Sequence, residues 1–169
     1  MRILGISGSL QQSSTNTAVV NIARARAPEG VDVMVFDGLA QIPPCNPDLE
    51  PAPAEVAAFR ALVQSADGLL IATPEYAHGL PGTLKNALDW LVGSGELYGK
   101  RVVVVSAAPS SDRGAYARAD LERTLRAQGA DVLASTTIAV PARARGREID
   151  DPEIVAAVDA ALKALVPAP

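Results

Sequence analysis

The sequence predicts an α/β fold, a three-layer sandwich in which a five-stranded parallel sheet carries helices on both faces. Short β-branched apolar runs alternate along the chain with segments in which apolar residues recur at helical spacing. The runs are apolar throughout, as expected of strands that are buried on both faces. The chain has 169 residues, 49% of them hydrophobic, which suits a single domain over residues 1–169.

Five apolar runs are the expected strands. In chain order they are Arg2–Ser7, Val31–Phe36, Gly68–Thr73, Arg101–Ser106 and Val132–Val140. A helix is expected after each run, because apolar residues recur there at helical spacing. These helical stretches cover residues 18–25, 56–63, 84–91, 121–125 and 155–165. Right-handed crossovers between parallel strands then place helices on both faces of the sheet.

Residues 41–53 contain five prolines and follow the second strand, so we expect an extended surface loop there. This segment is either a plain connector or a loop that folds over a ligand or a partner subunit. Near the end of the chain, Pro152 suits the first turn of a helix and Asp151 suits its N-cap.

Composition narrows the classes of function. The chain has 15 Lys and Arg against 19 Asp and Glu, and the basic residues are scattered, so no nucleic-acid partner is expected. With one cysteine, Cys45, and one histidine, His78, neither a disulfide within the chain nor a metal site is expected. No apolar stretch approaches 18 residues and no signal segment leads the sequence. We therefore expect a cytoplasmic protein without a membrane partner.

A loop of small hydroxylated residues follows the first strand. Gly8 permits a tight turn, and Ser9, Ser13, Ser14 and Thr15 precede the helix. The N-terminus of a helix offers free backbone N–H groups and a positive dipole end, and small side chains let a phosphate approach them. The loop is therefore interpreted as a phosphate site, with simple helix capping as the alternative. The glycine motifs of nucleoside triphosphate hydrolases and of dinucleotide-binding folds are absent.

The third expected strand ends in a second polar loop, Pro74-Glu75-Tyr76-Ala77-His78-Gly79-Leu80-Pro81-Gly82. Here the chain resembles the NADPH-dependent FMN reductase family of flavodoxin-like proteins, which includes chromate, quinone and azo-compound reductases. The matching residues of the first loop are Gly8, Ser9, Leu10, Ser14 and Asn16. Those of the second loop and its helix are Pro74, Glu75, Tyr76, Pro81, Gly82, Leu84, Lys85, Asn86, Ala87, Leu88, Asp89 and Trp90.

The resemblance implies the strand order 2-1-3-4-5 and a flavoenzyme. Hydride would pass from NADPH, or NADH, through FMN to a quinone, an azo compound, free flavin or a metal oxyanion. No catalytic side chain is implied, because FMN itself carries the hydride. The resemblance also implies a homodimer or homotetramer. The cofactor-binding residues would be Ser9, Gln11, Ser14, Thr15, Asn16, Pro74, Glu75, Tyr76, Ala77, His78, Gly79 and Ser106.

Three residues depart from the family pattern. Gln11 stands where the family commonly has Arg, and the loss of one charge-assisted contact to the phosphate could cost about 1.5–3 kcal/mol. Ala77 and Gly79 replace Asn and Ser. Two alternatives therefore stay open: a family member with weak or no flavin binding, and a non-enzymatic FMN-binding electron carrier.

Two further features have two interpretations each. His78 either contacts the flavin, nicotinamide or acceptor, or is a solvent-facing loop residue. Arg143, Arg145 and Arg147, just past the fifth strand, either attract the phosphate of NADPH or form a solvated turn.

Overall fold

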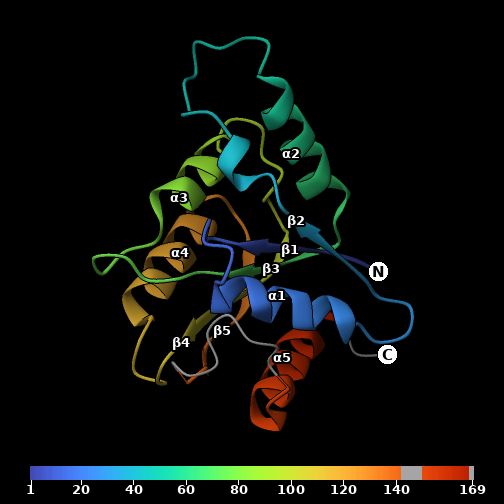
Figure 1. Cartoon of the computed structure of the whole chain (residues 1–169). Coiled ribbons are helices and arrows are strands. Elements are labelled where there is room, and N and C mark those ends of the chain that lie inside the picture. The colour runs from blue at the N-terminus through green and yellow to red at the C-terminus, as the bar shows by residue number, and fades with distance from the viewer. Residues whose placement is uncertain (142–149, 168–169) are drawn as a thin grey trace.

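Five parallel strands form one sheet in the order β2-β1-β3-β4-β5 (Figure 1). The computed structural model describes residues 1–141 and 150–167. The strands are β1 (Arg2–Ser7), β2 (Asp32–Phe36), β3 (Gly68–Ala72), β4 (Arg101–Ala108) and β5 (Asp131–Ala139). All four neighbouring pairs are parallel, which confirms the predicted sheet and its order.

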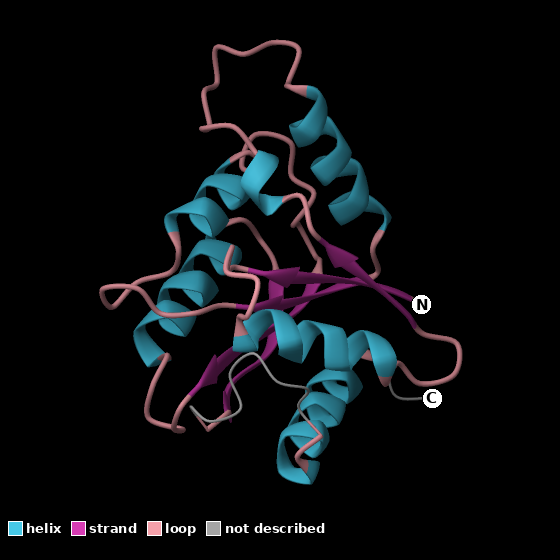
Figure 2. Ribbon diagram, viewed as in Figure 1, coloured by secondary structure: helices cyan, strands magenta, loops and turns pink. Residues whose placement is uncertain are grey.

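The helices cover both faces of the sheet (Figure 2). They are α1 (Thr15–Ala25), α2 (Ala54–Ser65), α3 (Gly82–Asp89), α4 (Ala115–Ala127) and α5 (Pro152–Leu165), with a short 3₁₀ turn, η1 (Leu39–Gln41), after β2. Apolar residues of α1 and α5 pack on one face, and those of α2, α3 and α4 pack on the other. The three predicted layers are therefore present.

Strand β3 shows why these runs are apolar throughout. Leu69 and Ile71 point into the layer of α2, α3 and α4, whereas Leu70 and Ala72 point into the layer of α1 and α5. All five residues of the strand are buried. A parallel strand with helices on both sides has no face for a polar side chain.

The strand limits differ from the expected ones by at most two residues. Strand β4 continues past Ser106 to Ala108, because Ala107 and Ala108 still pair with Ile138 and Ala139 of β5. At the start of α5 the expected cap is present, since Asp151 accepts a hydrogen bond from the backbone N–H of Glu153 at 3.0 Å. Arg143, Arg145 and Arg147 lie outside the described residues.

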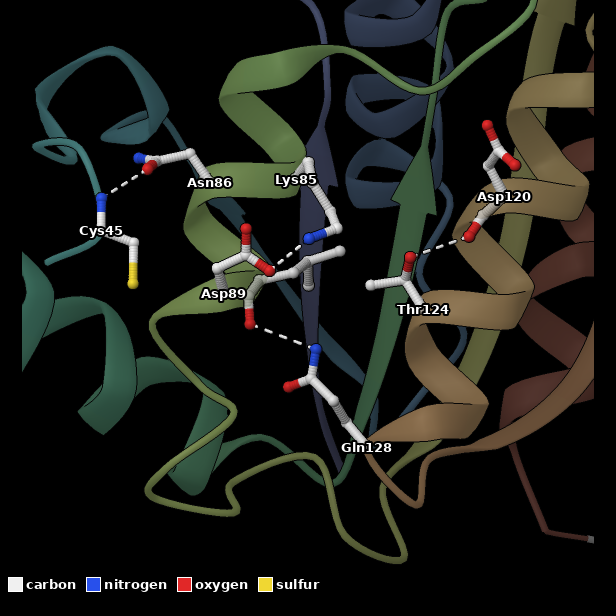
Figure 3. Close-up of polar contacts among 8 residues, drawn as sticks. Cys45, Lys85, Asn86, Asp89, Asp120, Thr124 and Gln128 are labelled. Atoms are coloured by element: carbon white, nitrogen blue, oxygen red, sulfur yellow. Dashed lines mark hydrogen bonds and ion pairs between the residues drawn. The ribbon is translucent and has the colours of Figure 1, made fainter. Parts of the chain in front are cut away.

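The proline-rich segment lies against α3. Pro43 O accepts hydrogen bonds from Asn86 Nδ2 and Trp90 Nε1, both at 2.9 Å. The backbone N–H of Cys45 donates to Asn86 Oδ1 at 2.7 Å (Figure 3). Figure 3 also shows Gln128, whose Nε2 donates to the backbone oxygen of Leu88 at 3.2 Å and so joins α4 to α3. Asn86 and Trp90 thus serve to hold this segment in place.

Candidate functional site

A cavity of about 260 Å³ opens where the loops after β1, β3 and β4 meet. It lies at the carboxyl ends of the strands, beside the point between β1 and β3 where the strand order reverses, which is the usual ligand position in open α/β sheets. The lining residues are Ser9, Gln11, Ser13, Ser14, Thr15, Asn16, Pro74, Glu75, Tyr76, Ser106, Ala107, Ala108, Pro109, Arg113 and Gly114. Nine of the twelve residues expected at a cofactor site are among them.

The first loop presents hydroxyl groups that each already accept one hydrogen bond. Ser9 Oγ accepts from the backbone N–H of Gln11 at 3.2 Å, and Ser14 Oγ accepts from that of Asn16 at 3.2 Å. Ser13 Oγ lies 3.2 Å from Gln11 Nε2, which donates to it. Each hydroxyl proton is left to donate elsewhere. This wall of the cavity therefore offers hydrogen-bond donors beside the positive end of α1.

Asn16 ties this loop to β4. Its Oδ1 accepts from the backbone N–H of Ala107 at 2.9 Å, and its Nδ2 donates to Ala107 O at 3.4 Å. Thr15 Oγ1 donates to the same carbonyl oxygen at 3.4 Å. Asn16 is only 3% exposed, so its amide serves first to fix the distance between the N-terminus of α1 and the end of β4.

The second loop contains a tight two-residue turn. The backbone N–H of Tyr76 donates to Gly79 O at 3.1 Å, and that of Gly79 donates to Tyr76 O at 3.0 Å. The central residues, Ala77 and His78, have φ of 50° and 61°. Such turns favour Asn-Gly, and left-handed backbone costs a residue with a Cβ about 1–2 kcal/mol. Ala77, His78 and Gly79 do not line the cavity.

Glu75 caps helix α4. The N-cap of that helix is Gly114, which has no side chain to accept its free N–H groups. Instead Glu75 Oε2 accepts from the backbone N–H groups of Tyr116 at 2.9 Å and Ala117 at 3.2 Å. The carboxylate of Glu75 thus fixes the second loop to α4. This helix follows the loop after β4, which is the third loop of the cavity.

His78 lies on the outside of this arrangement. Its ring meets Tyr116 edge-on, with the centroids 4.7 Å apart, and its Nδ1 is 3.7 Å from Glu75 Oε1. The His78 side chain is 76% exposed. The position supports the interpretation of His78 as a solvent-facing loop residue.

The end of β4 and the third loop, which follows it, line the cavity with Ser106, Ala107, Ala108, Pro109, Arg113 and Gly114. Gly114 has φ of 81°, and a Cβ there would lie 2.2 Å from Ser106 Oγ, so only glycine fits. The sequence predicts a contact from the loop after the fourth strand, starting at Ser106, but identifies no other residue of it. Asp112, in the same loop, accepts a hydrogen bond from the Ser110 side chain, which lowers the pKa of its carboxyl.

Comparison with known proteins identifies the family. The profile described as NADPH-dependent FMN reductase matches residues 1–144. The chain belongs to this family. A NAD(P)H-dependent FMN reductase of Pseudomonas aeruginosa is 36% identical over 129 residues, which cover 74% of this chain and 69% of the relative. The family implies FMN as cofactor and a nicotinamide nucleotide as reductant, as the sequence predicts.

Two more similarities support membership. A probable NADPH:quinone oxidoreductase of Oryza sativa subsp. japonica is 42% identical over 95 residues, 53% of this chain, and the match spans about half of that relative (47%). Among solved structures, a flavoenzyme NAD(P)H:(acceptor) oxidoreductase from Paracoccus denitrificans has a TM-score of 0.79 and 25% identity, with 97% of this chain and 96% of the other covered.

The cavity fits an FMN of this family on the chemistry of its donors. Ser9, Ser13 and Ser14 line the cavity and have hydroxyl protons to donate, and within the described residues the backbone N–H of Thr15 has no acceptor. Such a set suits a phosphate dianion. Pro74, Tyr76, Ala107, Ala108 and Pro109 add flat or small apolar surfaces to the lining, which suit a ring system.

Two kinds of feature are absent from residues 1–141 and 150–167. No helix there is both long and apolar enough to cross a membrane. No group of three or more His, Cys, Asp or Glu side chains in the same residues is arranged to hold a metal ion.

Proposed function

We propose that this protein is an NAD(P)H-dependent FMN oxidoreductase whose electron acceptor is a quinone. The observation that carries the proposal is the cavity, in which the first loop and the N-terminus of α1 supply hydrogen-bond donors and the second loop, the end of β4 and the third loop supply apolar surfaces. The names of its relatives, an FMN reductase and a quinone oxidoreductase, support the acceptor class. Azo compounds, free flavin and metal oxyanions are further acceptors for the same site.

In this proposal the chain binds and orients, and FMN, when bound, supplies the hydride chemistry. Ser9, Ser14 and the N–H of Thr15 hold the phosphate. Asn16 and Glu75 keep the three loops at a fixed spacing through their bonds to Ala107 and Tyr116. The mouth stays open beside Tyr76, which is 55% exposed, so that reductant and acceptor can enter in turn.

The second candidate function is that of a family member that binds flavin weakly, and one observation supports it. Gln11 donates to Ser13 and carries no charge, so the first loop offers the phosphate no cation of its own. The electron-carrier alternative predicts bound FMN without oxidation of NAD(P)H.

Flavin titration of the purified protein, followed by NADPH and NADH oxidation with a panel of acceptors, tests these proposals. We expect FMN to bind more tightly than riboflavin and a quinone to support turnover. Ser14→Ala should weaken FMN about tenfold and leave riboflavin unchanged, because one hydrogen bond to the phosphate is lost. Ser65→Ala, at the exposed end of α2, is the matched control. Absence of NAD(P)H oxidation in the presence of FMN contradicts the reductase.

The oligomeric state of the protein and its cellular location are further proposals. A homodimer or homotetramer is supported by exposed aromatic rings, Tyr116 at 61% and Tyr98 at 84%. Light scattering after size-exclusion chromatography tests it, and a single monomer peak at micromolar concentration contradicts it. The cytoplasmic location stays a prediction from the sequence.

A further inference from the structure

The second loop meets helix α4 at three places. Glu75 Oε2 accepts the backbone N–H of Tyr116 at 2.9 Å, and the ring of His78 meets the ring of Tyr116 edge-on with the centroids 4.7 Å apart. A Cβ on Gly79 would lie 3.3 Å from Asp120 Oδ2, so the backbone of the loop passes close to that carboxylate. Tyr116 and Asp120 both belong to the first half of α4. One helix therefore contacts the loop at both ends of its tight turn.

The central residues of this turn, Ala77 and His78, both have positive φ. Glycine or asparagine is usual at such positions, because a Cβ is unfavourable there. Backbone strain of this kind persists only where surrounding contacts hold it. The side chain of His78 makes two such contacts, the one with the ring of Tyr116 and an approach of Nδ1 to Glu75 Oε1 at 3.7 Å. The second distance is too long for a hydrogen bond, so the ring contact is the stronger candidate.

The turn reaches the cavity through Tyr76. This residue lines the cavity, whereas Ala77, His78, Gly79 and Tyr116 do not. The backbone N–H and the carbonyl oxygen of Tyr76 are both hydrogen-bonded to Gly79 across the turn. Opening of the turn would release both groups and let Tyr76 move away from the wall. The conformation of the turn therefore decides where Tyr76 lies.

We propose that His78 and Tyr116 are positioning residues, whose ring contact holds the turn closed and thereby keeps Tyr76 on the wall of the cavity. Neither His78 nor Tyr116 touches the ligand in this proposal. The effect on flavin rests on the proposed reductase function, because Tyr76 is then part of the surface that receives the flavin ring. The hold on the turn is a property of the protein alone and can be measured without flavin.

Amide hydrogen exchange measured by NMR tests the hold on the turn in the full chain without flavin. The reporters are the backbone N–H groups of Tyr76 and Gly79, and the hydrogen-bonded N–H of Gly99, between α3 and β4, is the control. We expect His78→Ala and Tyr116→Leu to speed exchange at both reporters about fivefold, because an edge-to-face ring pair favours the closed state by about two- to tenfold. Unchanged exchange at Gly99 shows that the fold is intact.

Two further variants identify the part of the side chain that matters. His78→Phe keeps a ring for the contact with Tyr116 and should exchange as the wild type does. Histidine, alanine and phenylalanine all carry a Cβ, so the backbone strain of the turn is the same in the three proteins. Val92→Ala shortens a side chain that is 63% exposed and does not line the cavity, and it should also behave as the wild type.

Titration with FMN and with riboflavin tests the effect on the cavity. His78→Ala should weaken both flavins by the same factor, about threefold, because a displaced Tyr76 alters the surface for the ring and leaves the serine loop unchanged. His78→Phe should bind both flavins as tightly as the wild type does. This rescue separates the ring contact from a general effect of substitution at His78.

Ala77→Asn separates the ring contact from the strain that it opposes. Asparagine adopts positive φ at less cost than alanine, so the turn should then stay closed without the ring contact. Ala77→Asn alone should slow exchange at Tyr76 and Gly79. In the Ala77→Asn protein, His78→Ala should speed that exchange less than about twofold and should leave both flavin affinities unchanged.

Three results overturn the inference. The first is unchanged exchange at Tyr76 and Gly79 in His78→Ala. The second is equally fast exchange in His78→Phe, which would assign the effect to the approach of the imidazole to Glu75. The third is a loss of FMN affinity in His78→Ala with riboflavin unchanged. Failure of the reductase function is distinguishable from all three, because the wild type then binds no flavin or oxidises no NAD(P)H, while amide exchange still reports on the turn.

Discussion

The carboxylate of Glu75 accepts the backbone N–H of Tyr116 at 2.9 Å, so a residue of the second loop caps a helix that begins 40 positions later. The same oxygen accepts the N–H of Ala117. Because Gly114 cannot cap α4, the helix depends on this carboxylate for two of its free N–H groups. One side chain thus sets both the start of α4 and the position of the loop beside the cavity.

Replacement of Glu75 by Ala should lower the free energy of unfolding by about 1–2 kcal/mol, since two N–H groups of α4 lose their acceptor. Glu75→Gln keeps an acceptor oxygen and should cost less than half as much. Urea unfolding followed by circular dichroism measures both. Glu122→Gln, which breaks a pair with the exposed Arg126 on the same helix, should change stability by less than about 0.5 kcal/mol. Equal losses for Glu75→Ala and Glu122→Gln would refute the cap.

Asn16→Ala should destabilise the protein by about 1–3 kcal/mol, because the buried N–H of Ala107 is left without an acceptor. The N-terminus of α1 is then no longer fixed to β4, so FMN affinity should also fall. Asn21→Ala, at an exposed position of the same helix, should change neither quantity. Urea unfolding and flavin titration of the two variants provide the check. An Asn16→Ala protein as stable as Asn21→Ala would contradict the role of the Asn16 amide.

The sheet could be predicted because burial on both faces is visible in the sequence itself. Residues 68–72 are apolar without interruption, and every one of them is buried. Residues 107 and 108 extend β4 beyond its expected end, and their strand assignment comes from pairing with β5 rather than from local composition. Strand existence is therefore a local property of this chain, whereas strand length depends on the neighbouring strand.

The site could be predicted only in part. The serines of the first loop have a recognisable composition at a strand end, and they line the cavity. The partner of Asn16 is 91 residues away and that of Glu75 is 41 residues away, and no periodicity links such positions. Arg113 was missed because single charges in polar loops are common. Its position between a buried strand and the next helix was the available signal, since all such loops meet at one edge of a parallel sheet.

Gly114→Ala should be among the most damaging single substitutions in the third loop. The new Cβ would lie 2.2 Å from Ser106 Oγ, and φ is 81°. Strain and overpacking together should cost about 2–4 kcal/mol. Gly95→Ala is a matched control, because φ there is 79° and no atom lies within 4 Å of the added Cβ. It should show the backbone strain alone, about 1–2 kcal/mol.

At Gly114 the cost of the clash with Ser106 can be separated from the cost of backbone strain by making the substitution in a Ser106→Gly protein. When Ser106→Gly removes the clashing side chain, Gly114→Ala should cost no more than Gly95→Ala does. Thermal and urea unfolding of the single and double variants give this coupling free energy. A coupling of zero would show that Ser106 moves aside without cost.

The ion pair between Arg26 and Asp159 should make stability depend on pH in the acid range. Arg26 Nε and Nη2 each donate to Asp159 at 2.7 Å, which joins the end of α1 to α5 and lowers the pKa of the Asp159 carboxyl. A carboxyl whose pKa is lower in the folded state contributes stability above its unfolded pKa, about 3.9, and loses that contribution as pH falls through the folded value.

A double-mutant cycle of Arg26→Gln and Asp159→Asn measures this contribution by urea unfolding at several pH values. The coupling free energy should be constant above about pH 5, should begin to fall as the pH drops below about 4, and should vanish once the pH lies below the lowered pKa of Asp159, since protonated Asp159 no longer attracts Arg26. Because both side chains are partly exposed, at 47% and 40%, added salt should reduce the coupling at neutral pH. A coupling that persists at low pH would show that packing, rather than charge, holds α1 against α5 at this point.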